Sequence, residues 1–401
     1  MEHETPGHAD HEGRVSVDFS RATLENALVD PESATARFVP GALAALWDHD
    51  PDEARPMIVK LLAINSERLR ASVAQTYSRI LGTGFYNDSD LVLLRSLLAD
   101  ESEWVVRSGL MALNSLSKET ASLAVELARA TNIGNSHFLA DELLAVFTFH
   151  QLFEHLMADD VETILEKLMA VPELAGHWIE EFLAQASMTF PRETMVFFMR
   201  RVERAAETED WHYRPSNHGP YGHVPLRFRD SDAYAELLRT VAEWMRAGKN
   251  KPFLFGYRAK ELFETCFGPF DGETVNFLEE WIATSDERDL RLIADILGET
   301  DHTFVFTHRS FVERYLDKAK QVSPDVLKQA AGSLLGSAIS GVRSGTPGEP
   351  MPRDLEMKSA SEQILRSLPR FSPAYVLYDA LRRHAEEDIA DSRRTKEAFE
   401  D

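Results

Sequence analysis

Three segments of the chain repeat one pattern, in which an apolar run is followed by a short polar break and by an arginine that opens the next apolar run. They span Leu62–Arg70, Leu98–Arg107 and Ile282–Arg291. Similar units that recur along a chain are typical of stacked helical repeats, because one helix pair cannot cover its own apolar face. The repetition therefore predicts an all-α body in which antiparallel helix pairs pack side by side.

The rest of the sequence favours the same architecture. From Ala22 onward the apolar residues follow the helical period, and the alternation typical of strands is nearly absent. Candidate helices of about 10–17 residues are joined by turns of about 2–5 residues, which makes neighbouring helices antiparallel. Ser66, Ser102 and either Ser285 or Asp286 are placed to begin helices, since their side-chain oxygens can accept hydrogen bonds from first-turn amides.

The segments with a break followed by arginine resemble the second helix of HEAT repeats, a family of armadillo-like α-solenoids. In that family an Asp or Asn in the turn and an Arg early in the second helix bond between neighbouring repeats. The resemblance assigns these places to Asn65 and Arg70, Asp100 and Arg107, and Asp286 and Arg291. It is good over residues 50–117 and 271–299, loose over 120–207, and absent over 208–230 and 343–353. It implies a HEAT-like right-handed α-solenoid of stacked antiparallel helix pairs.

The expected domain organisation follows from the ranges over which the resemblance holds and from two irregular segments that interrupt it. It consists of a disordered acidic and His-rich tail at 1–18, HEAT-like repeats over 19–207, an inserted aromatic and Arg-rich loop at 208–230, further repeats over 231–342, a Pro/Gly connector at 343–353, and a C-terminal helical cap over 354–401.

The charge, the cysteine content and the hydropathy of the chain disfavour several classes of partner and location. The 401 residues include 66 acidic and 43 basic side chains, which gives a formal net charge of −23. This balance disfavours general attraction to nucleic acids or anionic lipids. The only cysteine, Cys266, permits no intrachain disulfide and fits a reducing compartment. No apolar run approaches the roughly 20 residues of a membrane span, and the amino end lacks the apolar core of a secretory signal. We expect a cytoplasmic protein without membrane contact.

The segment 208–230 is rich in Pro and Gly, yet dense in aromatic and basic side chains. Three interpretations are open: a packed insertion over adjacent repeats, a loop that binds a protein partner, or a metal or catalytic site on three histidines. Trp, Tyr and Arg are common anchors of protein interfaces. The histidine spacing matches no zinc pattern, and no Cys accompanies it. The candidate partner-binding residues are Trp211, His212, Tyr213, Arg214, His218, Tyr221, His223, Arg227 and Arg229.

Catalytic motifs are not apparent: the sequence contains no Gly-x-Ser-x-Gly elbow, no phosphate loop and no zinc-ligand spacing. We therefore expect a non-catalytic scaffold or adaptor that binds protein partners and needs no cofactor or metal. One alternative is a sensor module, because the chain resembles the helical-repeat regions of STAND-type NTPases in bacterial signalling or defence. A second alternative is binding of an anionic ligand or nucleic acid through residues 200–260, where basic residues outnumber acidic ones.

Overall fold

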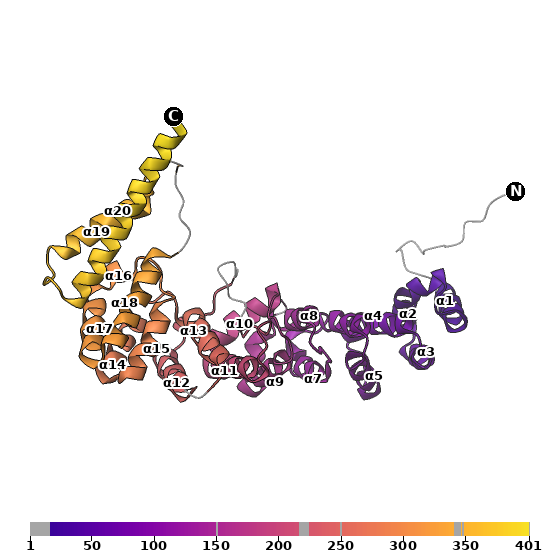
Figure 1. The fold of residues 1–401 in the computed structure, drawn as a ribbon. Coiled ribbons are helices and arrows are strands. Elements are labelled where there is room, and N and C mark those ends of the chain that lie inside the picture. The colour runs from indigo at the N-terminus through magenta and orange to yellow at the C-terminus, as the bar shows by residue number, and fades with distance from the viewer. Residues whose placement is uncertain are drawn as a thin grey trace. The chain divides into compact units, whose positions relative to one another are not determined.

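The computed structural model describes residues 17–149, 151–215, 224–248, 251–340, 346 and 349–400. Within these ranges all regular secondary structure is helical and no strand occurs (Figure 1). The helices pack in neighbouring pairs, so the expected all-α class is confirmed. Residues 1–16 of the expected tail and much of the 343–353 connector lie outside the described residues.

The chain divides into two compact units. The first contains the described residues up to Arg201 and those between Trp211 and Arg227; the second contains Val202–Asp210 and the described residues from Phe228 onward. The division crosses helix α11 (Pro191–Thr208), so the side chain of Arg201 belongs to the first unit although its helix continues into the second.

The first unit consists of two layers of helices. In the even layer α2, α4, α6, α8 and α10 contact one another in succession, and the odd layer contains α1, α3, α5, α7 and α9 (Figure 1). The bounds are α1 (Val17–Val29), α2 (Val39–His49), α3 (Pro51–Leu62), α4 (Glu67–Thr83), α5 (Asp88–Leu98), α6 (Glu103–Leu113), α7 (Ala121–Ala130), α8 (His137–Thr148), α9 (Ala158–Leu168) and α10 (His177–Thr189), with short 3-10 helices at Ala34–Phe38, Lys118–Thr120 and Phe153–His155.

Serine caps join successive helices of the even layer. Ser102 and Ser136 each accept a hydrogen bond from the amide three residues later and so begin α6 and α8. Their hydroxyls donate in turn to the carboxylates of Glu67 and Glu103, which are the first residues of the preceding even helices. One side chain thus begins a helix and sets its position against the helix before it. The predicted caps at Ser66 and Ser102 are confirmed.

Arginine–carboxylate pairs join successive helices of the odd layer. Each arginine donates to an acid 31 to 35 residues later, on the next odd helix. The pairs are Arg21–Glu53, Arg55–Asp90, Arg95–Glu126 and Arg129–Asp160. Most are partly exposed, and such pairs contribute about 0–1 kcal/mol each. They therefore fix the register of the layer more than they stabilise it.

Helix α10 takes its cap from a neighbouring helix. Gly176 occupies the N-cap position, and Asp141 of α8 accepts hydrogen bonds from the amides of Trp178 and Ile179 at 2.8 and 3.1 Å. A Cβ atom on residue 176 would lie 2.3 Å from Asp141 Oδ1, so glycine leaves the space that the carboxylate needs.

We expect Asp141→Ala to lower the free energy of unfolding by about 1–2 kcal/mol, because two first-turn amides of α10 lose their acceptor. Asp141→Asn keeps an acceptor oxygen and should cost less than half as much. Urea unfolding followed by circular dichroism measures both. If the asparagine variant lost as much stability as the alanine variant, the carboxylate would act through its charge and not as a cap.

The second unit repeats the layered arrangement. Here α13, α15, α18 and α20 contact one another in succession, as do α12, α14 and α17. Asp286 begins α15 by accepting from the amide of Asp289, which confirms that cap. The bounds are α12 (Tyr234–Ala247), α13 (Phe253–Phe267), α14 (Gly272–Thr284), α15 (Glu287–Leu297), α16 (Phe304–Thr307), α17 (Arg309–Val322), α18 (Pro324–Ile339), α19 (Pro352–Leu365) and α20 (Pro373–Glu400), after a 3-10 helix at Phe228–Asp230.

Two boundaries differ from expectation. Val17 and Asp18, which we placed in the terminal tail, belong to α1. Pro352 and Arg353, which we placed in the connector, are the first residues of α19. Proline is favoured at the first position of a helix because its missing amide hydrogen needs no partner there. The guanidinium of Arg353 also donates to the carbonyl of Ala338 at 2.7 Å, which ties this helix start to α18.

Candidate functional site

The structure places the six repeat residues at the joints between helices. Arg70 Nε of α4 donates to Asp100 Oδ2, in the turn before α6, at 2.7 Å. Partial burial alone would raise the pKa of Asp100, but hydrogen bonds from Arg70 and from the amide of Ser102 hold that pKa below its ordinary value. Asn65 lines an open hollow beside both members of this pair.

The other repeat arginines have different partners. Arg107 of α6 donates to Glu142 of α8 at 3.0 Å. Arg291 of α15 bonds to Glu287 within its own helix and to Gln329 of α18 at 2.8 and 2.9 Å. Asp100 and Arg107 therefore do not bond to each other, and Asp286 serves as a helix cap. Each of these arginines donates a hydrogen bond toward the next helix of its own layer, but the accepting residue differs from repeat to repeat.

The start of the 208–230 loop is anchored by Arg201, a residue that we had counted only as part of a basic stretch. Its side chain is fully buried. The guanidinium donates to the hydroxyl of Tyr213 and to five carbonyl oxygens at 2.6 to 3.2 Å. Those carbonyls belong to Leu168, Val171, Pro172, Arg214 and Pro215.

Tyr213 belongs to this anchor and not to an exposed surface. Its side chain is buried, its hydroxyl donates to the carbonyl of Met169 at 2.7 Å, and its ring lies 4.3 Å from the Arg201 guanidinium carbon. A side chain held in this way is not accessible to a partner, so we drop Tyr213 as a contact residue. Its physical role is to close the loop onto the α9–α10 turn.

The remaining loop candidates fall into three groups. Arg229 bonds to Asp271 and to the carbonyls of Phe267 and Pro269, which ties it to the second unit. His218, Tyr221 and His223 lie outside the described residues. Side chains with substantial exposure are Trp211, His212, Arg214 and Arg227.

Much of the positive charge over residues 200–260 is matched by internal carboxylates. The pairs include Arg200–Glu166, Arg229–Asp271, Arg239–Glu280, Arg246–Asp289, Lys251–Glu207, Arg258–Glu261 and Lys260–Glu299. Binding of a nucleic-acid backbone needs cations that can release its counterions. Cations already paired with acids supply little of that interaction, so this stretch is a weak candidate for an anion-binding surface.

A set of exposed aromatic side chains lies on the even layer of the first unit. Trp104 is the second residue of α6 and Phe138 the second residue of α8, and these helices pack side by side. Trp104 is 50% exposed and Phe138 is 65% exposed. Trp104 differs in this from Val105 and Leu110 of the same helix, which are buried.

Three further side chains extend this set. Met111 follows Trp104 by two helical turns on the same face of α6 and is half exposed. Trp178 is the second residue of α10, and its ring packs edge-on against Phe149 with centroids 5.6 Å apart. We call Trp104, Met111, Phe138, Phe149 and Trp178 the aromatic surface. It occupies three successive helices of one layer.

The aromatic surface has an acidic rim. Glu67, Glu101 and Glu103 are exposed at the turns that precede or begin α4 and α6. Glu67 and Glu103 accept hydrogen bonds from serine hydroxyls, and none of the three forms an ion pair within the described ranges. The rim therefore keeps its negative charge. An apolar surface with such a rim can accept apolar and basic side chains together.

The described residues give little support to a metal site, a reactive thiol or a membrane-spanning helix. No group of three or more His, Cys, Asp or Glu side chains among them is arranged to hold a metal ion. Cys266 is buried, and burial raises the pKa of its thiol, which keeps it protonated and unreactive. Among the helices described, none combines the length and the apolar character needed to cross a bilayer.

Comparisons with known proteins add one structural likeness. No family model matches the chain, and no curated protein matches it. A solved structure described as "Structure of the Pds5-Scc1 complex and implications for cohesin function" is similar with 16% sequence identity and a TM-score of 0.33. The match covers 95% of this chain and 56% of the other, so this chain spans little more than half of that one. A TM-score of this size does not establish a common fold, and the architecture above rests on the helices and their contacts.

Proposed function

We propose that the chain is a non-catalytic scaffold that binds a protein partner through the aromatic surface on α6, α8 and α10. The observation that carries this proposal is the exposure of Trp104 and Phe138 at the same position of adjacent helices. Single exposed apolar residues are ordinary, but several large apolar side chains on neighbouring helices of one layer are typical of an interaction site. Tryptophan in particular is enriched among the residues that dominate binding energy.

Rigid placement supports the same proposal. The first turns of α6 and α8 are held by Ser102 and Ser136, which bond both to their own helices and to the helix before. A surface that is fixed before binding loses little conformational entropy when a partner docks. The acidic rim favours a partner that places basic side chains around an apolar centre.

Site-specific photocrosslinking tests this function. A benzophenone amino acid at position 104 or 138, introduced into the full chain in its native host, should crosslink to one common protein. The matched control is position 59 on α3, where Val59 is similarly exposed but stands on the odd layer. Crosslinks to that same protein at equal yield from position 59, or no shared product from 104 and 138, would contradict the proposal.

A further inference from the structure

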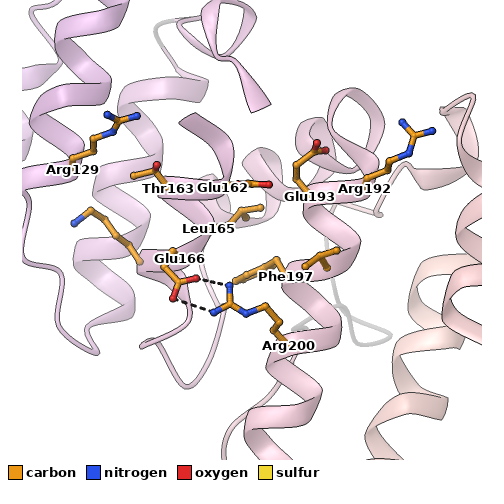
Figure 2. A pocket seen from close by; sticks show the side chains of 11 residues that line it. Arg129, Glu162, Thr163, Leu165, Glu166, Arg192, Glu193, Phe197 and Arg200 are labelled. Carbon is orange, nitrogen blue, oxygen red and sulfur yellow. Dashed lines mark hydrogen bonds and ion pairs between the residues drawn. The ribbon is translucent and has the colours of Figure 1, made fainter. Parts of the chain in front are cut away.

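A cleft opens in the first unit between α9 and α11, with a contribution from α7, and its volume is about 710 Å³ (Figure 2). It contains both basic and acidic side chains and a few apolar ones. The side chains that line it come from Arg129, Glu162, Thr163, Leu165, Glu166, Lys167, Arg192, Glu193, Val196, Phe197 and Arg200. A cleft of this volume has room for several side chains of a peptide or for a small ligand, so charge rather than size identifies the occupant.

The four cations of the cleft all have contacts within the protein, Arg192 among them. Arg200 donates to both carboxylate oxygens of Glu166, as Figure 2 shows, and Arg129 pairs with Asp160. Lys167 Nζ donates to the carbonyl of Thr131 at 2.9 Å, and burial lowers the pKa of its ammonium group. These groups hold α7, α9 and α11 together and have little capacity left for an anionic ligand.

Two acids of the cleft, in contrast, are free. Neither Glu162 of α9 nor Glu193 of α11 forms a hydrogen bond or ion pair within the described ranges. They come from the two helices that form opposite walls of the cleft (Figure 2). Two unpaired carboxylates on facing walls are suited to basic groups that enter between them.

The cleft also has apolar lining residues. Val196 is 51% exposed, whereas Leu165 and Phe197 are buried. Val196 follows Glu193 by three residues and so lies on the same face of α11. A ligand bound at Glu193 therefore has an exposed aliphatic side chain one helical turn away.

From this arrangement we propose that the cleft binds a basic amphipathic segment of another protein, with an apolar side chain on Val196 and basic side chains on Glu162 and Glu193. Charge complementarity selects this occupant, since the free groups are acidic and the whole chain carries −23. The cleft lies on α9 and α11, outside the aromatic surface, and the inference does not depend on the function proposed there.

The test uses the full chain with Trp104→Ala and Phe138→Ala, so that the aromatic surface does not contribute. The probe is a short fluorescein-labelled helical peptide with leucines on one face and lysines on the other, and anisotropy measures its dissociation constant. In this background Glu162→Gln with Glu193→Gln should weaken binding about tenfold or more, because two charge-assisted contacts are lost.

The control changes net charge equally outside the cleft. Glu25→Gln with Glu243→Gln alters exposed residues of α1 and α12 and should change the dissociation constant less than about twofold, because distant exposed charges are screened. Val196→Lys should weaken binding as strongly as the cleft pair, and a peptide with glutamate in place of lysine should not bind. Equal effects of the two glutamine pairs would mean adsorption by net charge and would overturn the proposal. The proposal would also be overturned, in favour of a polyamine ligand, if spermidine displaced the labelled peptide and Val196→Ala left the dissociation constant of the peptide unchanged.

Discussion

Replacing Arg201 with methionine is expected to lower the free energy of unfolding by about 4 kcal/mol or more. The side chain is fully buried, and its removal takes a donor from five carbonyl oxygens and the Tyr213 hydroxyl. The carbonyls of Leu168 and Pro172 keep a backbone donor, whereas those of Val171, Arg214 and Pro215 depend, among the described residues, on the guanidinium. A buried acceptor that loses its partner costs about 1–3 kcal/mol, and several are lost together here. Urea unfolding of the full chain measures the loss.

Arg200 provides the matched control, since it is the neighbouring residue on the same helix and accepts the same substitution. Its side chain is exposed and pairs with Glu166, so Arg200→Met should cost no more than about 1 kcal/mol. Arg201→Lys should fall between the two, because an ammonium group has three donors and lacks the planar fork. If both methionine variants were equally stable, the buried guanidinium would not be the anchor of the loop.

Replacing Tyr378 with alanine should destabilise the second unit by about 3–5 kcal/mol. This residue of α20 is fully buried, and its hydroxyl donates to the carbonyl of Val305 in α16 at 2.5 Å. Helix α20 packs against both α17 and α18. Loss of this contact should therefore loosen that packing.

Hydrogen exchange of the full chain shows where that loss occurs. Amides of α16, α18 and α20 should exchange faster in Tyr378→Ala, whereas Tyr378→Phe should lose only about 1 kcal/mol through the missing hydrogen bond. Val376→Ala is the exposed control on the same helix. Unchanged exchange in α16 and α18 would show that α20 does not stabilise the unit as a cap.

The helices themselves were predictable because they depend on local chemistry. Two helices that follow expected caps are α4 (Glu67–Thr83) and α15 (Glu287–Leu297). Their starts were found because Ser66 and Asp286 have the side chains that cap a first turn. The antiparallel arrangement of neighbouring helices was predictable as well, because short polar breaks between apolar helices make the chain reverse direction.

The side of a helix that a residue faces was harder to predict. Trp104 is adjacent to Val105 in one apolar run, but it shares a helix face with Arg107 and Met111, and that face of α6 is exposed. Arg201 was obscured in the opposite way, because it follows Arg200 in an apparently basic stretch. Its helical position, four residues after Phe197 and three after Phe198, places it on the apolar face, and this signal could have identified it.

The contacts of the cleft and the arginine–carboxylate pairs of the odd layer depend on which helices pack together, and the sequence alone does not show this. The odd-layer arginines recur at repeat-like intervals, which could have suggested their acids one repeat later. Glu162 and Glu193, however, are distinguished only by lacking a partner, and that requires the packing of α9 against α11.

The central claim is that the aromatic surface binds the partner, and the affinity of the crosslinked protein for single variants tests it most directly. Calorimetric titration with the full chain should show that Trp104→Ala raises the dissociation constant about tenfold or more, while Val59→Ala leaves it within about twofold. The same affinity for Trp104→Ala and the unaltered chain, with the fold intact by circular dichroism, would contradict the account.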